Sequence, residues 1–424
     1  MWNFTAIPST ISVQILPGFV YVTTTINQTL RMANMSSQNG SDLNDSCVFE
    51  ESHFLDTRYI TSGFVGFGIS SFGILSNIII LIVFSRYASR TANTILLQAL
   101  AVFDIGVLMC YILVYSLQFI FEYNQVYLGH VIFVHYVPYV YPFSRFTQTA
   151  SIYTMVMATV ERTVALINHN WARRLFTTTS AFFIVIMTVV ISIAMHIVRY
   201  WEVEVVHRQE CTGLSEFEVK PAEILNNPHY RKIFGVWFTN FSQILLPFTI
   251  LLVLTIINVL VFRKGIRSTQ QRQSSASEEI NRKMQQSRDV TKVLIVLVLT
   301  YLCFNALSVI LTLWEVIDIN SLTRRRYVYV TAVETINLCA ITNSSLRIIN
   351  YVILNRQFRS LARKLLWDAV SCTISREKYN NGYALASLGN SDHCNIPGDS
   401  QAVFPPVAAH LLLGNDYIRQ ATFA

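Results

Sequence analysis

The sequence predicts an all-α membrane protein, a seven-transmembrane helix bundle followed by a short amphipathic eighth helix. Of the 424 residues, 52% are hydrophobic and only 13% are charged, whereas an average soluble domain has roughly 25% charged residues. The apolar residues are concentrated in seven runs, each of the length that a helix needs to cross a bilayer, about 20 residues. This distribution excludes a disordered chain, a disulfide-stapled secreted module and a nucleic-acid binder.

The apolar runs are expected to be helices because backbone polar groups in lipid must be satisfied within each segment. Membrane strands would instead show alternating segments of about ten residues, which this sequence lacks. The helix bundle is expected at residues 60–354, with spans at 60–84, 93–119, 136–166, 175–198, 233–262, 290–317 and 327–354.

Residues 1–59 are expected to form an extracellular glycosylated tail. Several Asn-X-Ser/Thr sequons cluster there, and such a cluster indicates an exposed, translocated segment. No basic residue precedes Arg31, so the apolar stretch 11–22 lacks the basic flank of a signal peptide, and the first span is expected to direct insertion. The sequons begin at Asn3, Asn27, Asn34, Asn39 and Asn44.

The basic residues predict the orientation. If the N-terminus is outside, most lysines and arginines fall on the cytoplasmic side, and the acidic residues lean to the other side. Because segments rich in lysine and arginine stay in the cytoplasm, we expect a multi-pass protein of the plasma membrane with its N-terminus outside and its C-terminus inside.

Short motifs distinguish among seven-helix proteins. In chain order they are Asn77, the string 100–104 that ends in Asp104, the string Glu161-Arg162-Thr163, Pro247 and Tyr351. Over about residues 60–367, their order and spacing resemble the rhodopsin-like (class A) G-protein-coupled receptors. The resemblance implies an intracellular heterotrimeric G protein as partner, engaged at the cytoplasmic end through Glu161, Arg162 and Tyr351.

Further strings narrow the resemblance. They are Tyr141-Pro142-Phe143, the run 148–153, Arg199-Tyr-Trp-Glu202 and Asn343-Ser-Ser345. These are similar to the invertebrate FMRFamide and myosuppressin neuropeptide receptors, which implies an extracellular amidated peptide as ligand. Residues 355–367 resemble the eighth helix that lies on membrane lipids. Cys372 is then a candidate for palmitoylation, with an unmodified cysteine as the alternative. Residues 368–424 are expected to form a largely disordered cytoplasmic tail that kinases and arrestin can recognise.

The third span carries a mostly small or polar face that is expected to look into the bundle. At the position where amine receptors carry an aspartate the chain has Ser144, and at the position of the opsin lysine it has Ile341. The aspartate that binds an amine ligand and the lysine that binds retinal are therefore both absent. Helix packing by small residues is the alternative reading of the face formed by Ser144, Gln148, Ser151, Met155, Ala158 and Arg162.

The outer ends of the spans offer carboxylates and aromatic rings, which can meet the guanidinium, ring and amide of an Arg-Phe-amide peptide. We expect Arg145, a cation in this acidic rim, to pair with Glu334 or another acid. The alternative is that the acids are solvated and the aromatic residues form an ordinary interfacial belt. The candidate ligand-binding residues are Tyr141, Ser144, Arg145, Gln148, Glu202, Trp314 and Glu334.

A buried polar core is expected from Asp104, Ser151, Asn343 and Arg347. Arg347 stands where relatives carry Asn or Asp and help to hold a sodium ion beside the second-span aspartate. An arginine at mid-membrane costs about 2.5–3.5 kcal/mol on insertion scales, so it needs a partner. We hypothesise that an Asp104–Arg347 ion pair replaces the sodium ion.

Two other departures bear on activation and stability. The sixth span reads Cys303-Phe304-Asn305-Ala306, and Ile348 follows Arg347 in the seventh, so both spans lack the usual proline that kinks such helices. We expect altered signalling. Val137 stands where relatives carry a disulfide cysteine, which leaves Cys211 either with Cys47 as its partner or without one.

Two rival functions stay open. The first is an orphan chemosensory receptor for small molecules with the same architecture. The second is a seven-helix transporter with Asp104 and Arg347 as a coupling pair, but transporters tend to show repeats or broken helices, and neither is expected here. The sequence shows no metal cluster, phosphate loop or catalytic triad, so we expect no cofactor and no enzyme.

Overall fold

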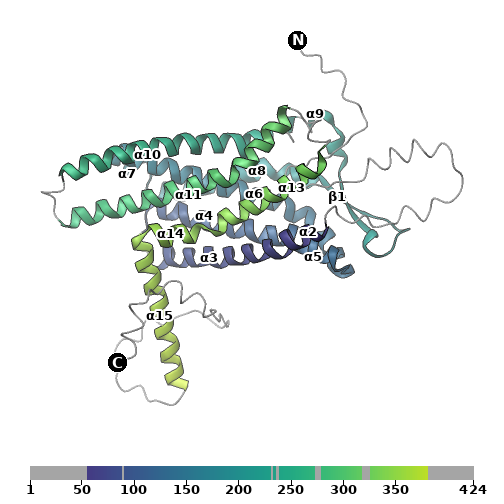
Figure 1. Cartoon of the computed structure of the whole chain (residues 1–424), viewed down its shortest axis with the longest axis horizontal. Helices are drawn as coiled ribbons and strands as arrows, with labels where there is room; N and C mark the ends of the chain where they lie inside the picture. The colour runs from purple at the N-terminus through teal and green to yellow at the C-terminus, as the bar shows by residue number, and fades with distance from the viewer. Residues whose placement is uncertain are drawn as a thin grey trace, which may run out of the picture.

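The computed structural model describes residues 55–87, 90–230, 233–234, 238–272, 278–317 and 325–380. Its helices lie side by side along one axis (Figure 1). By length and composition alone, six described helices are able to cross a membrane: Leu55–Arg86, Ala92–Tyr123, Tyr127–Ile167, Thr178–Trp201, Phe241–Lys264 and Arg288–Trp314. A more polar seventh follows near the C-terminal end. The predicted helix bundle is confirmed.

The first three helices are long and, in two cases, interrupted by π-helical turns. The first runs through α2 (Leu55–Arg58), η1 (Tyr59–Val65) and α3 (Gly66–Tyr87), and the second through α4 (Ala92–Tyr111), η2 (Ile112–Ser116) and α5 (Leu117–Tyr123). The third is α6 (Tyr127–Ile167). The Thr91 side chain accepts a hydrogen bond from the Thr94 amide at 3.3 Å, which caps the start of α4.

The remaining helices follow the expected order. A short α7 (His169–Leu175) precedes α8 (Thr178–His196) and η3 (Ile197–Trp201), and α9 (Pro228–Tyr230) precedes η7 (Phe241–Leu245) and α10 (Leu246–Arg272). The sixth helix is α11 (Glu278–Ile317), and the seventh comprises α13 (Arg326–Ser345) and α14 (Arg347–Leu354). The long α15 (Arg356–Asn380) leaves the bundle across its axis (Figure 1).

An antiparallel hairpin, which was not predicted, covers the end of the bundle opposite α15 (Figure 1); this is the outer end in the expected orientation. Its strands are β1 (Val203–His207) and β2 (Phe217–Pro221), paired from Val203 opposite Pro221 to His207 opposite Phe217. Short 3-10 turns, η4 (Gly213–Ser215) and η5 (Glu223–Asn226), flank β2. Val219 and Leu225 are buried with Val137 and Tyr141 of α6, so apolar packing fixes the hairpin over the third helix.

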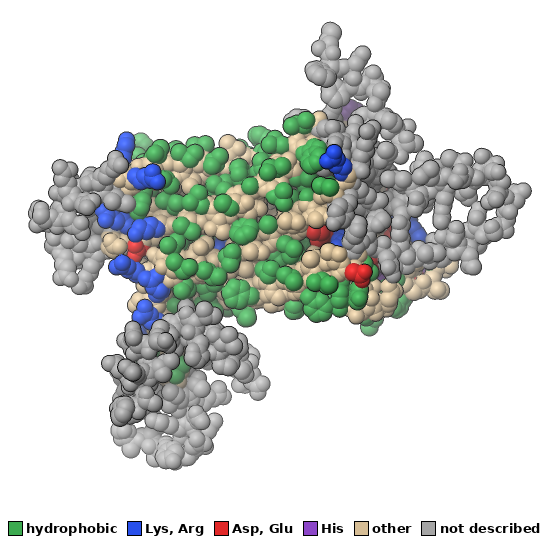
Figure 2. Space-filling view, in the orientation of Figure 1, with side chains coloured by type: hydrophobic (Ala, Val, Ile, Leu, Met, Phe, Trp, Pro, Cys, Tyr) green, Lys and Arg blue, Asp and Glu red, His purple; other side chains and the backbone are tan. Residues whose placement is uncertain are grey.

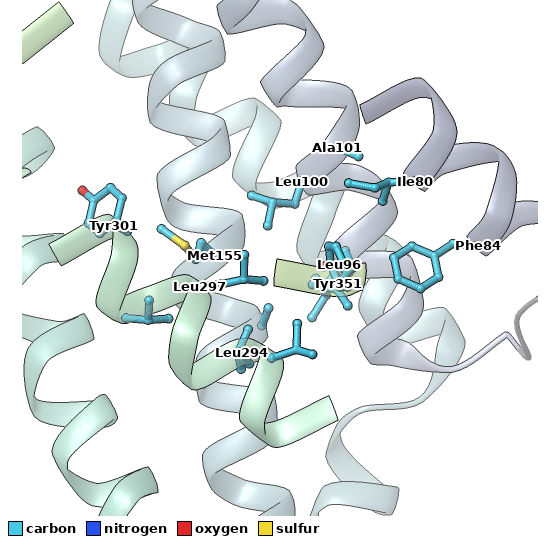
Figure 3. Close-up of a cluster of buried hydrophobic side chains, with 14 of the residues drawn as sticks. Ile80, Phe84, Leu96, Leu100, Ala101, Met155, Leu294, Leu297, Tyr301 and Tyr351 are labelled. Atoms are coloured by element: carbon cyan, nitrogen blue, oxygen red, sulfur yellow. The ribbon is translucent and has the colours of Figure 1, made fainter. Parts of the chain in front are cut away.

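The largest buried cluster includes Phe358 and Ala362 of α15, and Figure 3 shows part of it. It joins residues from α3, α4, α6, α11 and α14, among them Leu96, Met155, Leu297 and Tyr351. Since lipid tails are as apolar as these side chains, close van der Waals packing rather than hydrophobic exclusion holds this layer together. The third-helix face was predicted correctly: Ser151, Met155 and Ala158 are all buried.

The seventh helix breaks at Leu346 (φ −74°, ψ −7°) although it has no proline. Ser345 Oγ donates to the carbonyl oxygens of Ile341 at 2.8 Å and Ile69 at 3.0 Å, and Asn77 Nδ2 donates to the Ser344 carbonyl at 3.1 Å. Serine pairs are a recognised cause of helix kinks. The expectation of unbroken helices is therefore wrong here, because side chains interact with the backbone carbonyls at a point where proline usually makes the kink.

The eighth helix is longer than expected. It begins after Asn355, whose Oδ1 accepts from the Phe358 amide at 3.0 Å, and it continues past residue 367 to Asn380. The prediction of disorder from residue 368 is thus wrong for residues 368–380. The rest of the tail, the Cys372 side chain, Cys47 and the five N-terminal sequons lie outside what the structure describes.

Candidate functional site

A buried ion pair lies at the centre of the bundle. Arg347 Nη1 of α14 lies 2.7 Å from Asp104 Oδ2 of α4, and the Asp104 side chain has no exposed surface. Ser151 Oγ of α6 donates to the other carboxylate oxygen at 2.7 Å, and Ser344 Oγ is 3.5 Å from that oxygen. The expected contact between Asp104 and Arg347 is present.

The break at Leu346 positions this pair. Arg347 is the first residue of α14, directly after the break, which turns its side chain toward α4 and α6. The N–H groups of Arg347 Nη1 do not point at Asp104 Oδ2 as a hydrogen bond requires, so the contact is an ion pair without a hydrogen bond. Asn343, also expected in this core, is buried, but the seventh-helix hydroxyl that approaches Asp104 is that of its neighbour Ser344, which sequence reasoning missed.

Near the C-terminal end of α6, Arg162 is held inside the bundle. Its Nε lies 2.8 Å from Glu161 Oε2 and donates to Asn93 Oδ1 of α4 at 3.1 Å. Tyr351 is buried, with its ring centroid 5.4 Å from that of Phe84 and 5.3 Å from that of Phe358. The three residues expected to engage a G protein therefore face inward, and Asn93 is a further partner that the sequence did not single out.

Toward the middle of α6, on the outer side of Ser151, three of the candidate ligand-binding side chains are neighbours. Arg145 Nη1 donates to Gln148 Oε1 at 3.1 Å, and its Cζ lies 5.8 Å from the centre of the Tyr141 ring. Residues three and four apart share one face of a helix. Ser144 is half-buried on the same turn, and its carbonyl accepts from Thr147 Oγ1 at 2.9 Å.

Glu202 is not a solvated rim acid. It is 1% exposed and pairs with Arg199, with 3.3 Å between Arg199 Nη1 and Glu202 Oε2, while Tyr230 donates to its other oxygen at 2.8 Å. Burial and the Glu202 carboxylate raise the pKa of the Tyr230 phenol, so the phenol stays protonated and donates. Arg199 also donates to Tyr141, Thr239 and His196. The ligand-binding role expected for Glu202 is thus replaced by a structural one.

Glu334 also has a partner within the chain, but the partner is Arg58 rather than Arg145. Arg58 Nη2 donates to Glu334 Oε1 at 2.5 Å, and Ser62 Oγ donates to Oε2 at 2.6 Å. This contact joins the outer ends of the first and seventh helices. Trp314 lies in a separate apolar group with Leu311, Tyr329 and Val333.

The cysteines partly follow expectation. Cys211 is buried and disulfide-bonded, and its predicted partner Cys47 lies outside the described residues. Cys110, Cys303 and Cys339 are free, as expected for cysteines within the spans. Within the described part of the chain, no three His, Cys, Asp or Glu side chains are grouped so as to hold a metal ion.

Comparison with known proteins agrees with this architecture. The sequence profile described as serpentine type 7TM GPCR chemoreceptor Srw matches residues 64–368. A protein of Drosophila melanogaster named FMRFamide receptor is 27% identical over 290 residues, which cover 68% of this chain and 50% of that protein. The chain thus spans about half the length of this relative. It is a G-protein-coupled receptor, not an enzyme, and it belongs to the serpentine type 7TM chemoreceptor Srw family.

Proposed function

We propose that this chain is a plasma-membrane receptor for an amidated neuropeptide of the FMRFamide or myosuppressin type, which signals to a heterotrimeric G protein. The observation that carries this proposal is the polar seam along α6. It runs from Arg145 and Gln148 in the middle of the helix, through Ser151 beside Asp104, to Arg162 near its C-terminal end. The relative named FMRFamide receptor supports the peptide class.

The described geometry corresponds to a closed state. Arg162 is held by Glu161 and Asn93, so a G protein engages it only after the cytoplasmic ends of the helices move. A peptide that binds more tightly to the open arrangement shifts the equilibrium toward it by the difference in affinity. Ser151 and Asp104 lie between the two ends, where a movement of α6 relative to α14 changes their contacts.

The surface supports the proposed orientation. Figure 2 shows hydrophobic side chains over the middle of the bundle and lysine and arginine gathered at the end from which α15 leaves. A cytoplasmic location is the usual one for such a basic end. Arrestin binding to the tail, lipid contact by α15 and palmitoylation at Cys372 are part of the same proposal. Exposed basic residues at this end include Arg86, Arg263, Lys264, Arg356, Arg363 and Lys364.

A chemosensory function for small molecules is the second candidate. The description of the matched family favours it, and so does the pairing of Glu202 and Glu334 with arginines of this chain. Because of these pairings, the guanidinium of a peptide ligand would have to displace an arginine of the chain from the carboxylate. The transporter alternative has no such support, because the matched family consists of receptors.

A panel of amidated peptides, applied to cells that express the receptor, separates these candidates. Calcium and cyclic-nucleotide readouts should show a saturable response to FMRFamide or a related peptide. Arg162→Ala should abolish that response, and Arg86→Ala, which removes an exposed arginine at the same end, should retain it at equal surface expression. Responses to small volatile or soluble compounds alone would replace the peptide by the chemosensory function.

A further inference from the structure

The Arg58 guanidinium is held between a carboxylate and an aromatic ring at the outer end of the bundle. Its Nε and Nη2 donate to Glu334 Oε1 at 3.1 and 2.5 Å. Its Cζ lies 4.4 Å from the centre of the Phe119 ring. Ser62 Oγ donates to the second Glu334 oxygen at 2.6 Å, which fixes the plane of the carboxylate. The three groups around Arg58 come from the first, second and seventh helices.

This arrangement matches the chemistry of guanidinium recognition. Carboxylates accept charge-assisted hydrogen bonds from guanidinium N–H groups, and aromatic faces attract a cation that lies above them. Phe119 is 1% exposed, so its face is shielded from water. A lysine ammonium would gain less here, because it lacks the planar fork of donors and does not stack.

The contact is accessible from the outer end. The side chains of Arg58 and Glu334 keep 14% and 11% of their surface exposed, and Arg58 ends the short α2 at the entry of the chain into the bundle.

We propose that Glu334, Ser62 and Phe119 form a guanidinium-binding subsite for the arginine of the peptide, and that Arg58 occupies this subsite as a built-in competitor when no peptide is bound. This inference rests on the proposed function. Binding exchanges one guanidinium for another at Glu334 and releases the first helix from the seventh. No covalent step is involved.

The second arginine–glutamate pair does not offer the same exchange. The side chains of Arg199 and Glu202 are each 1% exposed. Arg199 is also held by Tyr141 and Thr239, at 3.2 and 2.9 Å. A ligand guanidinium would have to break this network and bury itself completely. Of the two acids expected to meet the ligand, only Glu334 is therefore exchangeable.

Removal of the competitor should raise agonist potency. In Arg58→Gln, the subsite no longer has to be vacated, and the EC50 for FMRFamide should fall by about tenfold, because apparent affinity scales with the fraction of receptor that is competent to bind. The analogue with citrulline in place of arginine should gain nothing. In Glu334→Gln, the two peptides should become equally potent. Arg208→Gln, which removes a half-buried arginine paired with Glu218 on the hairpin, is the matched control and should change neither EC50.

A second measurement does not depend on the identity of the peptide. Purified Arg58→Ala should be stabilised against thermal unfolding by millimolar methylguanidinium, in a saturable way, and not by methylammonium. The double variant Arg58→Ala/Glu334→Gln should show no such difference between the two ions. If Arg58→Ala is not recovered folded, the same thermal measurement is made on Arg58→Gln and on Arg58→Gln/Glu334→Gln, with the same expectation.

The outcomes separate the subsite from the peptide assignment. Stabilisation by methylguanidinium together with silence toward every amidated peptide would support the subsite and overturn the proposed ligand. A peptide response that is equal for arginine and citrulline, with no effect of Arg58→Gln and no difference between the two small cations, would overturn the subsite and leave the peptide receptor intact.

Discussion

Removal of the cation from the buried pair tests the central ion pair directly. Two unit charges 2.7 Å apart attract by about 6 kcal/mol at an effective dielectric constant of about 20. In Arg347→Met, Asp104 stays buried without its counter-charge, and breaking a buried pair in this way costs about 3–5 kcal/mol. Asp104→Asn should cost a similar amount because it leaves the arginine buried. The double variant Asp104→Asn/Arg347→Met contains neither charge and should lose less than either single variant.

Thermal unfolding of the purified receptors measures these losses. Because Cys303 is free and exposed, all variants carry Cys303→Ser, and a thiol-reactive dye then reports unfolding when the buried Cys110 becomes exposed. At roughly 2 °C or more per kcal/mol, each single variant should unfold at least about 6 °C below the parent. If the two single losses simply add in the double variant, the side chains are not coupled, and the ion pair has no energetic meaning.

A sodium titration tests what the pair replaces. In Arg347→Asn, Asp104 keeps the nearby hydroxyls of Ser151 and Ser344, and oxygen ligands of this kind suit a hard cation. Sodium chloride should then stabilise the variant more than choline chloride does, and agonist affinity should become sensitive to sodium. The parent receptor should show neither effect. Equal responses of parent and variant to sodium would contradict the replacement.

Three further predictions concern packing, the disulfide and the second ion pair. A Cβ on Gly73 would lie 2.8 Å from Leu108 Cδ1, whereas one on Gly68 would meet nothing within 4 Å. Gly73→Ala should therefore lower the free energy of unfolding by about 1–3 kcal/mol through overpacking. Gly68→Ala is the control and should leave stability unchanged. Cys211→Ser should lower stability by about 2–5 kcal/mol, and non-reducing peptide mapping should recover Cys211 joined to the N-terminal tail. Arg199→Met should reduce folded surface receptor, measured by flow cytometry, because it leaves a buried carboxylate without its cation.

The helical architecture could be predicted because it depends on composition. Long apolar runs in lipid have one solution for their backbone polar groups, so the spans followed from hydropathy alone. The pairing of Asp104 with Arg347 could also be predicted, because the resemblance to rhodopsin-like receptors places Arg347 opposite the second-span aspartate and a buried arginine needs an acid. The hairpin was harder to predict. Its strands, Val203–His207 and Phe217–Pro221, are short, mixed in polarity and held mainly by the third helix beneath them.

The partners of the outer acids could not be predicted for a different reason. Glu334 and Arg58 are separated by 276 positions, and no local pattern shows that the first and seventh helices meet there. Arg145 was expected to pair with Glu334 or another acid, but the partner of Glu334 is Arg58. Glu202 looked like a rim acid because it follows a span, but it is buried, and its carboxylate is bound by Arg199 and Tyr230. Long-range topology decided both cases.

The break in the seventh helix and the ion pair depend on each other. Arg347 is the first residue of α14, and a cation at a helix N-terminus is opposed by the helix dipole. The negative charge of Asp104 therefore offsets both the cost of burying the Arg347 cation and its unfavourable interaction with the helix dipole. Without the carboxylate, as in Asp104→Asn, the arginine should no longer hold α14 in place, and hydrogen exchange at residues 346–350 should accelerate while exchange in α6 stays unchanged. Slow exchange at those amides in Asp104→Asn would show that Ser345 and Asn77 hold the break without the ion pair.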